Sequence, residues 1–440
     1  MKISRLLMFT VVSVFALSTY ASAEQNPRFA SFGEFRQGLD QATLAEYAAS
    51  RVESPAAFEE MRAHLHDLYD GVHVSHSYEV DGQVFDCIPI MEQPSVRLNG
   101  ITTIATPPPP STMDAGDPSE AAQQAVFFDP SQDKDAYGNQ RSCEEGSIPM
   151  RRITLEEMTR FRTLRGFFNK IPEGLETAPS ETAPSFEPPS TVLHKYSHAN
   201  QQVNNWGGNG YLNLWQPAIN TSKGEGFSLT QHWYVGGSGT SLPGLQTVEI
   251  GWQVYPSLYG DTKPHFFIYH TADGYNHTGC YNLTCSDFVQ TSSSIHIGSS
   301  IGPVSVSGGS QYEIQIQVQF YQGNWWLRYG GTAFGYYPKA LFHGGQLTKN
   351  ATVVDYGTET TGTNDWPPAG SGAFSSKGWQ KAAYIRDLFY LNSGLTGYWE
   401  TLTRQQPSTN CFTITGPSYS SSSGWGAYFY DGGPGGTTCQ

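Results

Sequence analysis

The stretch QYEIQIQVQFY, residues 311–321, alternates apolar and polar side chains over its whole length. This period of two is typical of a β-strand with one face against a protein core, because successive strand side chains point to opposite faces. The side chains expected to face the core are Ile314, Ile316, Val318 and Phe320. The side chains expected on a polar outer face are Glu313, Gln315, Gln317 and Gln319.

The same alternation recurs along the C-terminal half of the chain, between clusters of turn residues. The other alternating runs are GFSLTQHWYV (226–235), TVEIGWQVYP (247–256), HFFIYH (265–270), SSIHIG (293–298), NWWLRYG (324–330) and ATVVDYG (351–357). Many short strands without intervening helices favour an antiparallel arrangement. We therefore predict that residues 191–440 form an all-β domain, an antiparallel β-sandwich or jelly roll.

The part of the chain before this domain is richer in charge and has helical periodicity. Three segments with apolar residues at spacings of three and four predict helices: residues 31–52, 54–72 and 154–168. Ser54 is expected to cap the second helix, with Pro55 at its first position, and Thr154 is expected to cap the third. Together with the extended run QVFDCIPI (83–90), these features predict a smaller α+β domain over residues 24–170.

Two further segments complete the predicted organisation. Lys2 and Arg5 precede an apolar run, and Ala-Ser-Ala at 21–23 fits a cleavage site, so residues 1–23 are expected to be a signal peptide. Residues 171–190 have no periodicity and are rich in Pro, Glu, Ser and Thr, which is typical of an extended, protease-sensitive linker. This organisation is that of a zymogen, or alternatively of a two-domain binding protein whose linker is only a spacer.

Charge and hydropathy restrict the classes of partner. The chain of 440 residues has a formal net charge of −14 and no basic patch that would neutralise phosphates, so nucleic acid is not an expected partner. After residue 190 the chain holds only ten of the 25 Lys and Arg residues and twelve of the 39 Asp and Glu residues. The apolar run at 6–17 is too short to span a bilayer, and no later segment qualifies. We expect a monomer, secreted to the extracellular space or the periplasm.

The six cysteines support export to an oxidising compartment. They fall into three couples that are local in sequence: Cys87 with Cys143, Cys280 with Cys285, and Cys411 with Cys439. Six cysteines allow fifteen pairings, but local pairing keeps each bridge within one domain. A zinc site is the alternative, although no C-x-x-C or H-E-x-x-H spacing occurs. We expect neither a metal nor a cofactor.

The C-terminal domain has no G-x-S-x-G nucleophile motif. Its histidines have no ligand spacing and are interpreted as surface or strand residues: His194, His198, His232, His265, His270, His277, His296 and His343. The run HTADGYNH (270–277) contains Asp273 as its only carboxylate and is interpreted as a turn. Glutamates are therefore the remaining candidates for chemistry.

Three of the five glutamates in this domain have ordinary explanations. Glu225 lies in the turn SKGEG and is expected to be solvated, whereas Glu313 is expected to be structural on its polar strand face. Glu400 is expected to form an ion pair with Arg404.

The other two glutamates have more unusual surroundings. Glu249 is in the middle of a predicted strand beside Gly251, where the missing side chain leaves room for a ligand or a second backbone. Glu359, in VVDYGTETTG, follows a predicted strand and a glycine, from where its side chain can lie over a sheet. Two carboxylates that meet over one sheet push their pKa values apart and give one acid and one base.

Several longer motifs carry a resemblance to a known family. Those before the linker are DGQVFDCIPIMEQPS (81–95) and CEEGSIPMRR (143–152). Those after it are VEIGWQVYPSLYGD (248–261), GCYNLTCSDFVQ (279–290), WWLRYGGTAFGYYPKALF (325–342), YGTE (356–359), GSG (370–372) and GGPGG (432–436). In these motifs and their order the chain resembles the neprosin family, secreted glutamic endopeptidases that cut after proline and carry an N-terminal activation domain.

The resemblance implies that Glu249 and Glu359 are the catalytic residues, because they match the glutamate before the family's Gly-Trp and the one that closes its W-G-G-E. Tyr356 and Thr358 replace the usual Trp and Gly, and Ala369 stands where Met commonly precedes Gly-Ser-Gly. These departures concern the shape of the subsite and not the acid pair.

A glutamate pair implies that one carboxylate activates a water and the other, protonated, assists the scissile carbonyl and the leaving amine, which requires acidic pH. Proline selectivity would come from an aromatic pocket, for which the candidates are Trp252, Trp325, Trp326, Tyr356 and Trp366. The highly charged N-terminal domain is expected to release in acid, so that the mature enzyme starts near residue 190. The alternatives are a glycoside hydrolase with two glutamates and a lectin-like binding module without catalysis.

Overall fold

The computed structural model describes residues 29–47, 49–109, 122–170, 194–237, 244–405, 410–421 and 424–439. The expected signal peptide (1–23), the expected linker (171–190) and the expected start of the mature enzyme near residue 190 lie outside these residues. Within the described ranges, no helix has both the length and the apolar character needed to cross a membrane.

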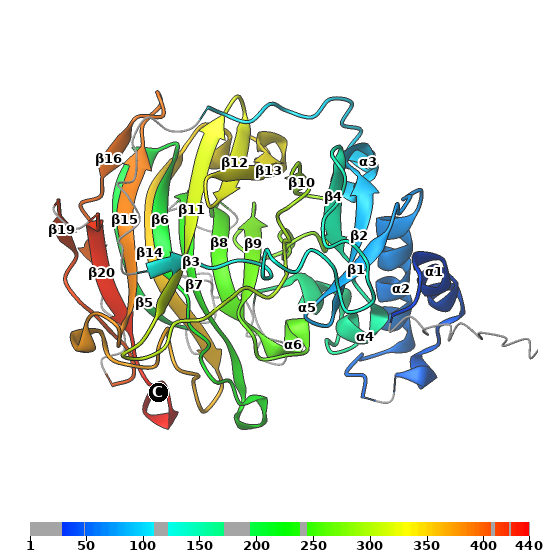
Figure 1. Cartoon of the computed structure of the whole chain (residues 1–440), viewed down its shortest axis with the longest axis horizontal. Helices are drawn as coiled ribbons and strands as arrows, with labels where there is room; N and C mark the ends of the chain where they lie inside the picture. Colours follow the sequence, from blue (N-terminus) through cyan, green and yellow to red (C-terminus); the bar gives the residue numbers. More distant parts are fainter. Residues whose placement is uncertain are drawn as a thin grey trace, which may run out of the picture.

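Two β-sheets that pack face to face make up the C-terminal part of the molecule (Figure 1). The larger sheet has the strand order β10-β13-β12-β11-β6-β15-β20-β18, with β3 paired to β11, β16 to β15 and β19 to β20. Its strands are β3 (Ala122–Gln124), β6 (Gly207–Asn213), β10 (Val289–Gln290), β11 (Gln311–Tyr321), β12 (Asn324–Tyr329), β13 (Thr332–Pro338), β15 (Ala383–Leu391), β16 (Gly397–Trp399), β18 (Thr413–Ile414), β19 (Ser418–Ser420) and β20 (Gly426–Gly432).

The smaller sheet has the order β17-β5-β14-β7-β8-β9, and its neighbouring strands are antiparallel. Its strands are β5 (His194–Asn205), β7 (Glu225–Gly236), β8 (Gln246–Val254), β9 (His265–Thr271), β14 (Ala351–Gly362) and β17 (Thr403–Arg404). The short helix α6 (Pro256–Tyr259) follows β8. The predicted antiparallel β-sandwich is confirmed.

Alternate residues of the strands form the core between the two sheets. On β8 the apolar set Val248, Ile250, Trp252 and Val254 is fully buried. The indole nitrogen of Trp252 donates to the carbonyl of Asn213 on β6, which shows that this face of β8 looks at the larger sheet. On β11 the predicted core residues Ile314, Ile316 and Val318 are buried, and Phe320 is half-buried.

Two predictions about the strands are wrong. The run SSIHIG (293–298) alternates in sequence but forms no strand, and its buried His296 packs against Phe127 of the N-terminal domain. Glu313 does not lie on a solvated face. It is 1 % exposed and forms an ion pair with Arg386, and its Oε2 accepts a hydrogen bond from Tyr384.

The N-terminal domain combines helices with a three-stranded antiparallel sheet of order β1-β2-β4. Its elements are α1 (Phe32–Gln41), α2 (Pro55–Tyr69), β1 (Ser77–Val80), β2 (Gln83–Pro89), α3 (Pro94–Arg97), β4 (Ser147–Arg151), α4 (Leu155–Met158) and α5 (Leu164–Phe168). Ser54 caps α2 with Pro55 at its first turn, as predicted. The predicted α+β character is confirmed.

The other two predicted helices are shorter than expected. The helix expected over 31–52 ends at Gln41. The helix expected over 154–168 is split into α4 and α5, although Thr154 caps α4 as predicted. The split occurs because Thr163 is itself an N-cap, with its hydroxyl accepting a hydrogen bond from the backbone N–H of Gly166.

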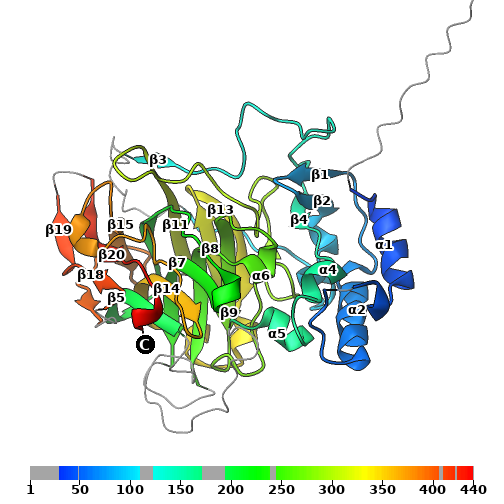
Figure 2. The same cartoon turned by 90° about the horizontal axis from the view of Figure 1, so that it is seen from below.

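The N-terminal domain lies against one end of the sandwich, beyond β9 and β10, with α1 and α2 on its outer side (Figures 1 and 2). One of its strands, β3, adds in parallel to β11 of the larger sheet. Apolar residues of both domains form one continuous buried cluster. The three disulfides have the predicted pairings, Cys87–Cys143, Cys280–Cys285 and Cys411–Cys439.

Candidate active site

Glu249 and Glu359 lie on neighbouring parts of one sheet face. β7 is paired with β8 on one side and with β14 on the other, so that Gln231 of β7 lies between the strands that carry the two glutamates. The three side chains point away from the larger sheet, because their strand neighbours form the core. The structure thus brings together the two glutamates that the sequence analysis selected, and it places Gln231 between them.

Two glycines explain how this face stays open around Gln231. Gly251 on β8 and Gly357 on β14 are the residues directly opposite Gln231. A Cβ atom on Gly251 would lie 2.1 Å from the carbonyl oxygen of Thr230 and 2.7 Å from Cα of Gln231. A Cβ atom on Gly357 would lie 2.4 Å from the carbonyl oxygen of Ser197. The glycine beside Glu249 therefore permits a close approach of backbones, as expected for a glycine within a strand.

The two carboxylates converge on a single cation, Lys170. Its Nζ atom lies 2.6 Å from Oε2 of Glu249 and 2.6 Å from Oε2 of Glu359. All three side chains are buried, with exposed fractions of 4 % or less. Lys170 belongs to the N-terminal domain and follows α5 closely in the chain. Burial alone would lower the pKa of the Lys170 ammonium, but the two carboxylates outweigh it and raise this pKa.

Helix α5 is anchored on a turn that also contacts the site. Arg165 of α5 donates to the carbonyl oxygens of Tyr275, Thr278 and Gly279. This turn is held by Asp273, whose carboxylate accepts hydrogen bonds from the backbone N–H groups of residues 276, 277 and 278. The interpretation of HTADGYNH as a turn is therefore confirmed, and this turn also anchors helix α5 of the N-terminal domain.

The same turn presents Tyr275 to Glu249. The Tyr275 hydroxyl donates to Oε1 of Glu249 at 2.6 Å, and the Thr247 hydroxyl donates to the same atom at 2.8 Å. Gln231 donates to Oε2 of Glu249 at 3.0 Å. Tyr275 has a φ angle of +66°, a left-handed conformation that is costly for a bulky side chain and is often found at functional sites.

Glu359 has a different set of partners. Nδ1 of His194 lies 2.6 Å from its Oε1 atom, and Gln231 reaches its Oε2 atom at 3.4 Å. Burial alone would raise the pKa of Glu359. The Lys170 ammonium and His194 outweigh burial and lower the pKa of Glu359 to about 2. The ion pair with Lys170 is therefore kept as the pH falls, until the pH approaches that value.

Trp233 also lies beside the two glutamates and Lys170, with its ring centroid 5.4 Å from Nζ of Lys170. Trp233 is on β7, opposite Glu249 of β8. The aromatics named as pocket candidates are all buried side chains: Trp252, Trp325, Trp326, Tyr356 and Trp366. Strand alternation in GFSLTQHWYV could have identified Trp233, because Gln231 and Trp233 share one face.

Two of the three departures from the family pattern, Tyr356 and Thr358, lie on the opposite face of β14. The Tyr356 hydroxyl donates to Glu400, and its ring packs edge-on against His232 in the interior. Thr358 donates a hydrogen bond to the buried carboxylate of Asp431. Because Gly357 and Glu359 alternate with these two residues, the substitutions leave the glutamate-bearing face unchanged.

The remaining glutamates differ from their predicted environments. Glu225 is not solvated but largely buried, and its carboxylate accepts a hydrogen bond from the backbone N–H of Asn220. Glu400 is bonded to Tyr356 and not to Arg404, whose guanidinium donates to the carbonyl of Ile414. Burial raises the pKa of Glu400 well above its usual value. Neither glutamate contacts the cluster around Lys170.

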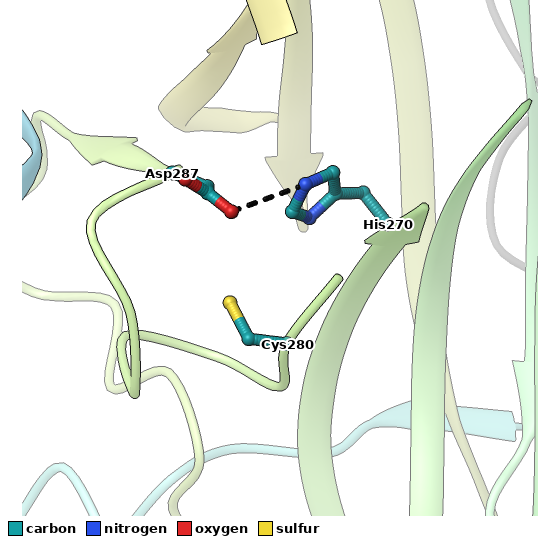
Figure 3. A group of neighbouring side chains, drawn as sticks. All are labelled: His270, Cys280 and Asp287. Atoms are coloured by element: carbon teal, nitrogen blue, oxygen red, sulfur yellow. Dashed lines mark ion pairs between the residues drawn. The ribbon is translucent and has the colours of Figure 1, made fainter. Parts of the chain in front are cut away.

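One group of potential metal ligands occurs among the described residues, His270, Cys280 and Asp287 (Figure 3). Cys280 is bonded to Cys285 in a disulfide and therefore has no thiolate to offer. His270 and Asp287 form an ion pair at 3.2 Å through Nε2 of the ring. We interpret this group as structural.

The chain is similar to one protein family over part of its length and to solved structures of peptidases. Residues 224–434 match the family model described as Neprosin. Among solved structures, the chain is similar to Scytalido-glutamic peptidase with a peptide-based transition-state analogue, at 11 % identity over 54 % of this chain and 97 % of that chain, with a TM-score of 0.30. It is also similar to SCP-B, a member of the Eqolisin family of peptidases in a complex with the tripeptide Ala-Ile-His, at 10 % identity over 55 % of this chain and 98 % of that chain, with a TM-score of 0.27.

Proposed function

This chain belongs to the Neprosin family, and we propose that it is the zymogen of a secreted glutamic endopeptidase that cleaves after proline at acidic pH. The observation that carries the proposal is the pair Glu249 and Glu359, whose Oε2 atoms each lie 2.6 Å from one buried cation. In this proposal residues 24–170 are the pro-domain, residues 171–190 are the cleaved linker and residues 191–440 are the catalytic domain.

The convergence of the two carboxylates suits the activation of one water molecule. A water in the place of the Lys170 ammonium would contact both Oε2 atoms. The ionised carboxylate takes a proton from this water as its oxygen bonds to the scissile carbonyl carbon. The protonated carboxylate stabilises the carbonyl oxygen and then protonates the leaving amine as the C–N bond breaks. The products are a peptide with a new carboxyl terminus and a peptide with a new amino terminus.

This chemistry requires a single proton on the pair, which explains the expected acidic optimum. Two carboxylates that face the same point repel each other when both are ionised, so one of them retains a proton to higher pH than an isolated carboxylate. At neutral pH this proton is lost, and the donor for the carbonyl oxygen is lost with it.

Latency is supported by the position of Lys170. As long as the N-terminal domain is docked, the Lys170 ammonium pairs with both carboxylates and occupies the place that the water needs. Arg165 holds the Tyr275 turn at the same time. The pro-domain in this proposal therefore inhibits in cis by direct occupation of the active site.

Release in mild acid needs a group other than Glu359, because the pKa of Glu359 is lowered to about 2. His296 of the C-terminal domain is a suitable group. Its side chain is 1 % exposed and is surrounded by four aromatic rings of the N-terminal domain: Tyr78, Phe85, Phe127 and Phe128. Burial lowers the pKa of His296 to about 4, from a usual value of 6.5.

The sign of this shift favours release as the pH falls. A histidine whose pKa is lowered by docking stabilises the docked state fully above about pH 6.5, and this stabilisation is lost as the pH falls toward 4. Nε2 of His296 bonds to the Tyr78 hydroxyl at 2.6 Å, and Nδ1 to the carbonyl of Ser294. Two charged groups lie near the aromatic rings. Arg141 lies over Phe128, and the negative charge of Asp86 adds to burial in raising the pKa of Tyr78.

Selectivity for proline is assigned to the face of Trp233. The Lys170 ammonium lies over this ring in the docked state, so departure of Lys170 uncovers an aromatic surface beside the glutamate pair. A pyrrolidine ring stacks well on an aromatic face, because it is apolar and carries no N–H once it is within a peptide chain.

The proposal is tested by hydrolysis of a proline-containing peptide at acidic pH after maturation of the precursor. Glu249→Gln and Glu359→Gln should each lower kcat by about 10³-fold or more, because each removes one proton-transfer group. Glu225→Gln is the matched control, since Glu225 carries the same side chain on β7 without contact to Lys170, and it should retain activity. Activity on oligosaccharides alone would identify a glycoside hydrolase, and ligand binding without hydrolysis would identify a binding module.

A further inference from the structure

His194 contacts one of the two proposed catalytic carboxylates directly. Its Nδ1 atom lies 2.6 Å from Oε1 of Glu359, and both side chains are 2 % exposed. The ring stacks against Tyr196 of the same strand and lies edge-on to Phe227. Its other nitrogen, Nε2, is buried without a hydrogen-bond partner among the residues that the structure describes. Glu359 is therefore the polar group to which the His194 ring bonds.

The two glutamates lose their shared lysine cation once Lys170 leaves. In the docked state one ammonium lies between two buried carboxylates. In the described part of the chain, no other lysine or arginine forms an ion pair with Glu249 or Glu359. Two carboxylates that face the same point repel each other when both are ionised, so the departure of Lys170 favours proton uptake in this cluster.

The hydrogen bonds show where these protons belong. Oε1 of Glu249 accepts from the hydroxyls of Tyr275 and Thr247, which are neutral donors and bond to a carboxylate or to a carboxylic acid alike. Oε2 of Glu249 accepts a hydrogen bond from the Gln231 amide, and once Lys170 has left, its second lone pair can take a proton. Oε1 of Glu359 instead faces a ring nitrogen of His194, and a positively charged ring there favours an ionised carboxylate.

We propose that His194 is a positioning residue of the active site, which as an imidazolium holds Glu359 ionised. Glu359 then takes the proton from the water, and Glu249 carries the proton that reaches the scissile carbonyl. This inference rests on the proposed peptidase function and goes beyond it by assigning the base and the acid. Histidine suits the role because it gains its charge at mildly acidic pH.

The groups that face this ring come from several elements. Glu359 on β14 is the charged partner, and the phenol of Tyr196 on β5 packs against the ring. Glu249 on β8 lies across the cluster, and Lys170 is present only until maturation. Since His194 begins β5, processing that removes it would also remove this function, so the cut must fall before residue 194.

The test is the pH dependence of kcat/KM for the matured wild type, His194→Asn and His194→Ala on one proline-containing peptide. Asparagine keeps a neutral N–H donor near the place of Nδ1, and alanine keeps none. Loss of the positive charge should move the acid limb of the profile upward by about one pH unit in H194N and further in H194A. KM should stay close to the wild-type value, because His194 touches Glu359 and not the substrate. H198N is the matched control, as His198 lies on the same face of β5 but bonds to Asp355, and its acid limb should not move.

The outcomes separate this inference from the proposed function. Acid limbs of H194N and H194A at the wild-type position, with an active wild type and an inactive E359Q, would overturn the role of His194 alone. A matured wild type without peptidase activity would overturn the proposed function and this inference together. If neither variant folds, NMR of the histidine rings in the matured wild type decides. A His194 ring protonated on both nitrogens at the working pH supports the assignment, and a neutral ring contradicts it.

Discussion

Lys170 makes the shortest link between the two domains at the candidate site, with Nζ at 2.6 Å from a carboxylate oxygen of Glu249 and of Glu359. Breaking a buried ion pair by removing one partner costs about 3–5 kcal/mol, because the other charge is left without compensation. In this molecule the penalty would fall on the docked state, since solvent can reach the carboxylates once the N-terminal domain leaves. We therefore expect the proposed latency to depend most strongly on Lys170.

We predict that Lys170→Met, which keeps the side-chain length and removes the charge, makes the precursor mature at a pH where the wild type stays latent. The rate of appearance of the mature form, followed by gel or mass spectrometry, should rise about tenfold or more, in line with the loss of a buried ion pair. Lys134→Met is the control, because Lys134 is an exposed lysine of the same domain. Equal rates for K170M and the wild type would mean that Lys170 does not hold the precursor closed.

The residues of the site differ in how far the sequence could identify them. Glu249 and Glu359 could be selected because carboxylates are rare after residue 190 and two of them lie beside glycines. Lys170, His194 and Tyr275 could not, because each reaches the pair through a contact between segments that are distant in the chain. A single histidine without ligand spacing carries no signal of such a contact.

At the scale of elements, strand alternation predicted the sheets well where one face of the strand meets the core. QYEIQIQVQFY coincides with β11, and GFSLTQHWYV lies within β7. Alternation failed in SSIHIG, where Ile295 and Ile297 are buried without strand pairing. It also placed Glu359 after a strand, whereas β14 continues to Gly362, because Thr360 and Thr361 are β-branched and suit a strand. Periodicity therefore predicts burial more surely than it predicts a strand.

Gly251 shows how an element depends on one missing side chain. We predict that Gly251→Ala lowers the free energy of unfolding of the C-terminal domain by about 2 kcal/mol or more, because the added Cβ would meet backbone atoms that cannot move independently. It should also displace Gln231 from the glutamate pair and lower activity. Thermal unfolding followed by circular dichroism measures the first effect. Gly416→Ala, with no atom within 4 Å of the added Cβ, should unfold like the wild type; an equal effect of both substitutions would contradict the argument.

At the scale of the whole molecule, two contacts between the domains are expected to respond differently to acid. The ion pair at Lys170 persists down to low pH because the pKa of Glu359 is about 2. The aromatic surroundings of His296 lose stability much earlier, since its pKa of about 4 lies below the usual value of 6.5. Protonation at the domain boundary would therefore loosen the docked state first, and departure of Lys170 would follow.

We predict that His296→Phe, which fills the same space without a titratable group, slows maturation at pH 4 relative to the wild type. The shift in the pKa of His296 from 6.5 to about 4 corresponds to a weakening of docking by up to roughly 300-fold in acid, and this contribution disappears in the variant. At neutral pH both proteins should remain latent. The exposed His343, replaced by Asn, is the control. Maturation of H296F at the wild-type rate at pH 4 would show that the acid response arises elsewhere.

The central claim is that Glu249 and Glu359 act as one unit that shares a single proton. The most direct measurement is the pH dependence of kcat/KM for the matured enzyme on a proline-containing peptide, together with E249Q and E359Q. We predict a bell-shaped profile with both limbs on the acid side of neutrality and almost no activity for either variant. A rate that keeps rising through neutral pH, or an E249Q enzyme as active as the wild type, would contradict the claim.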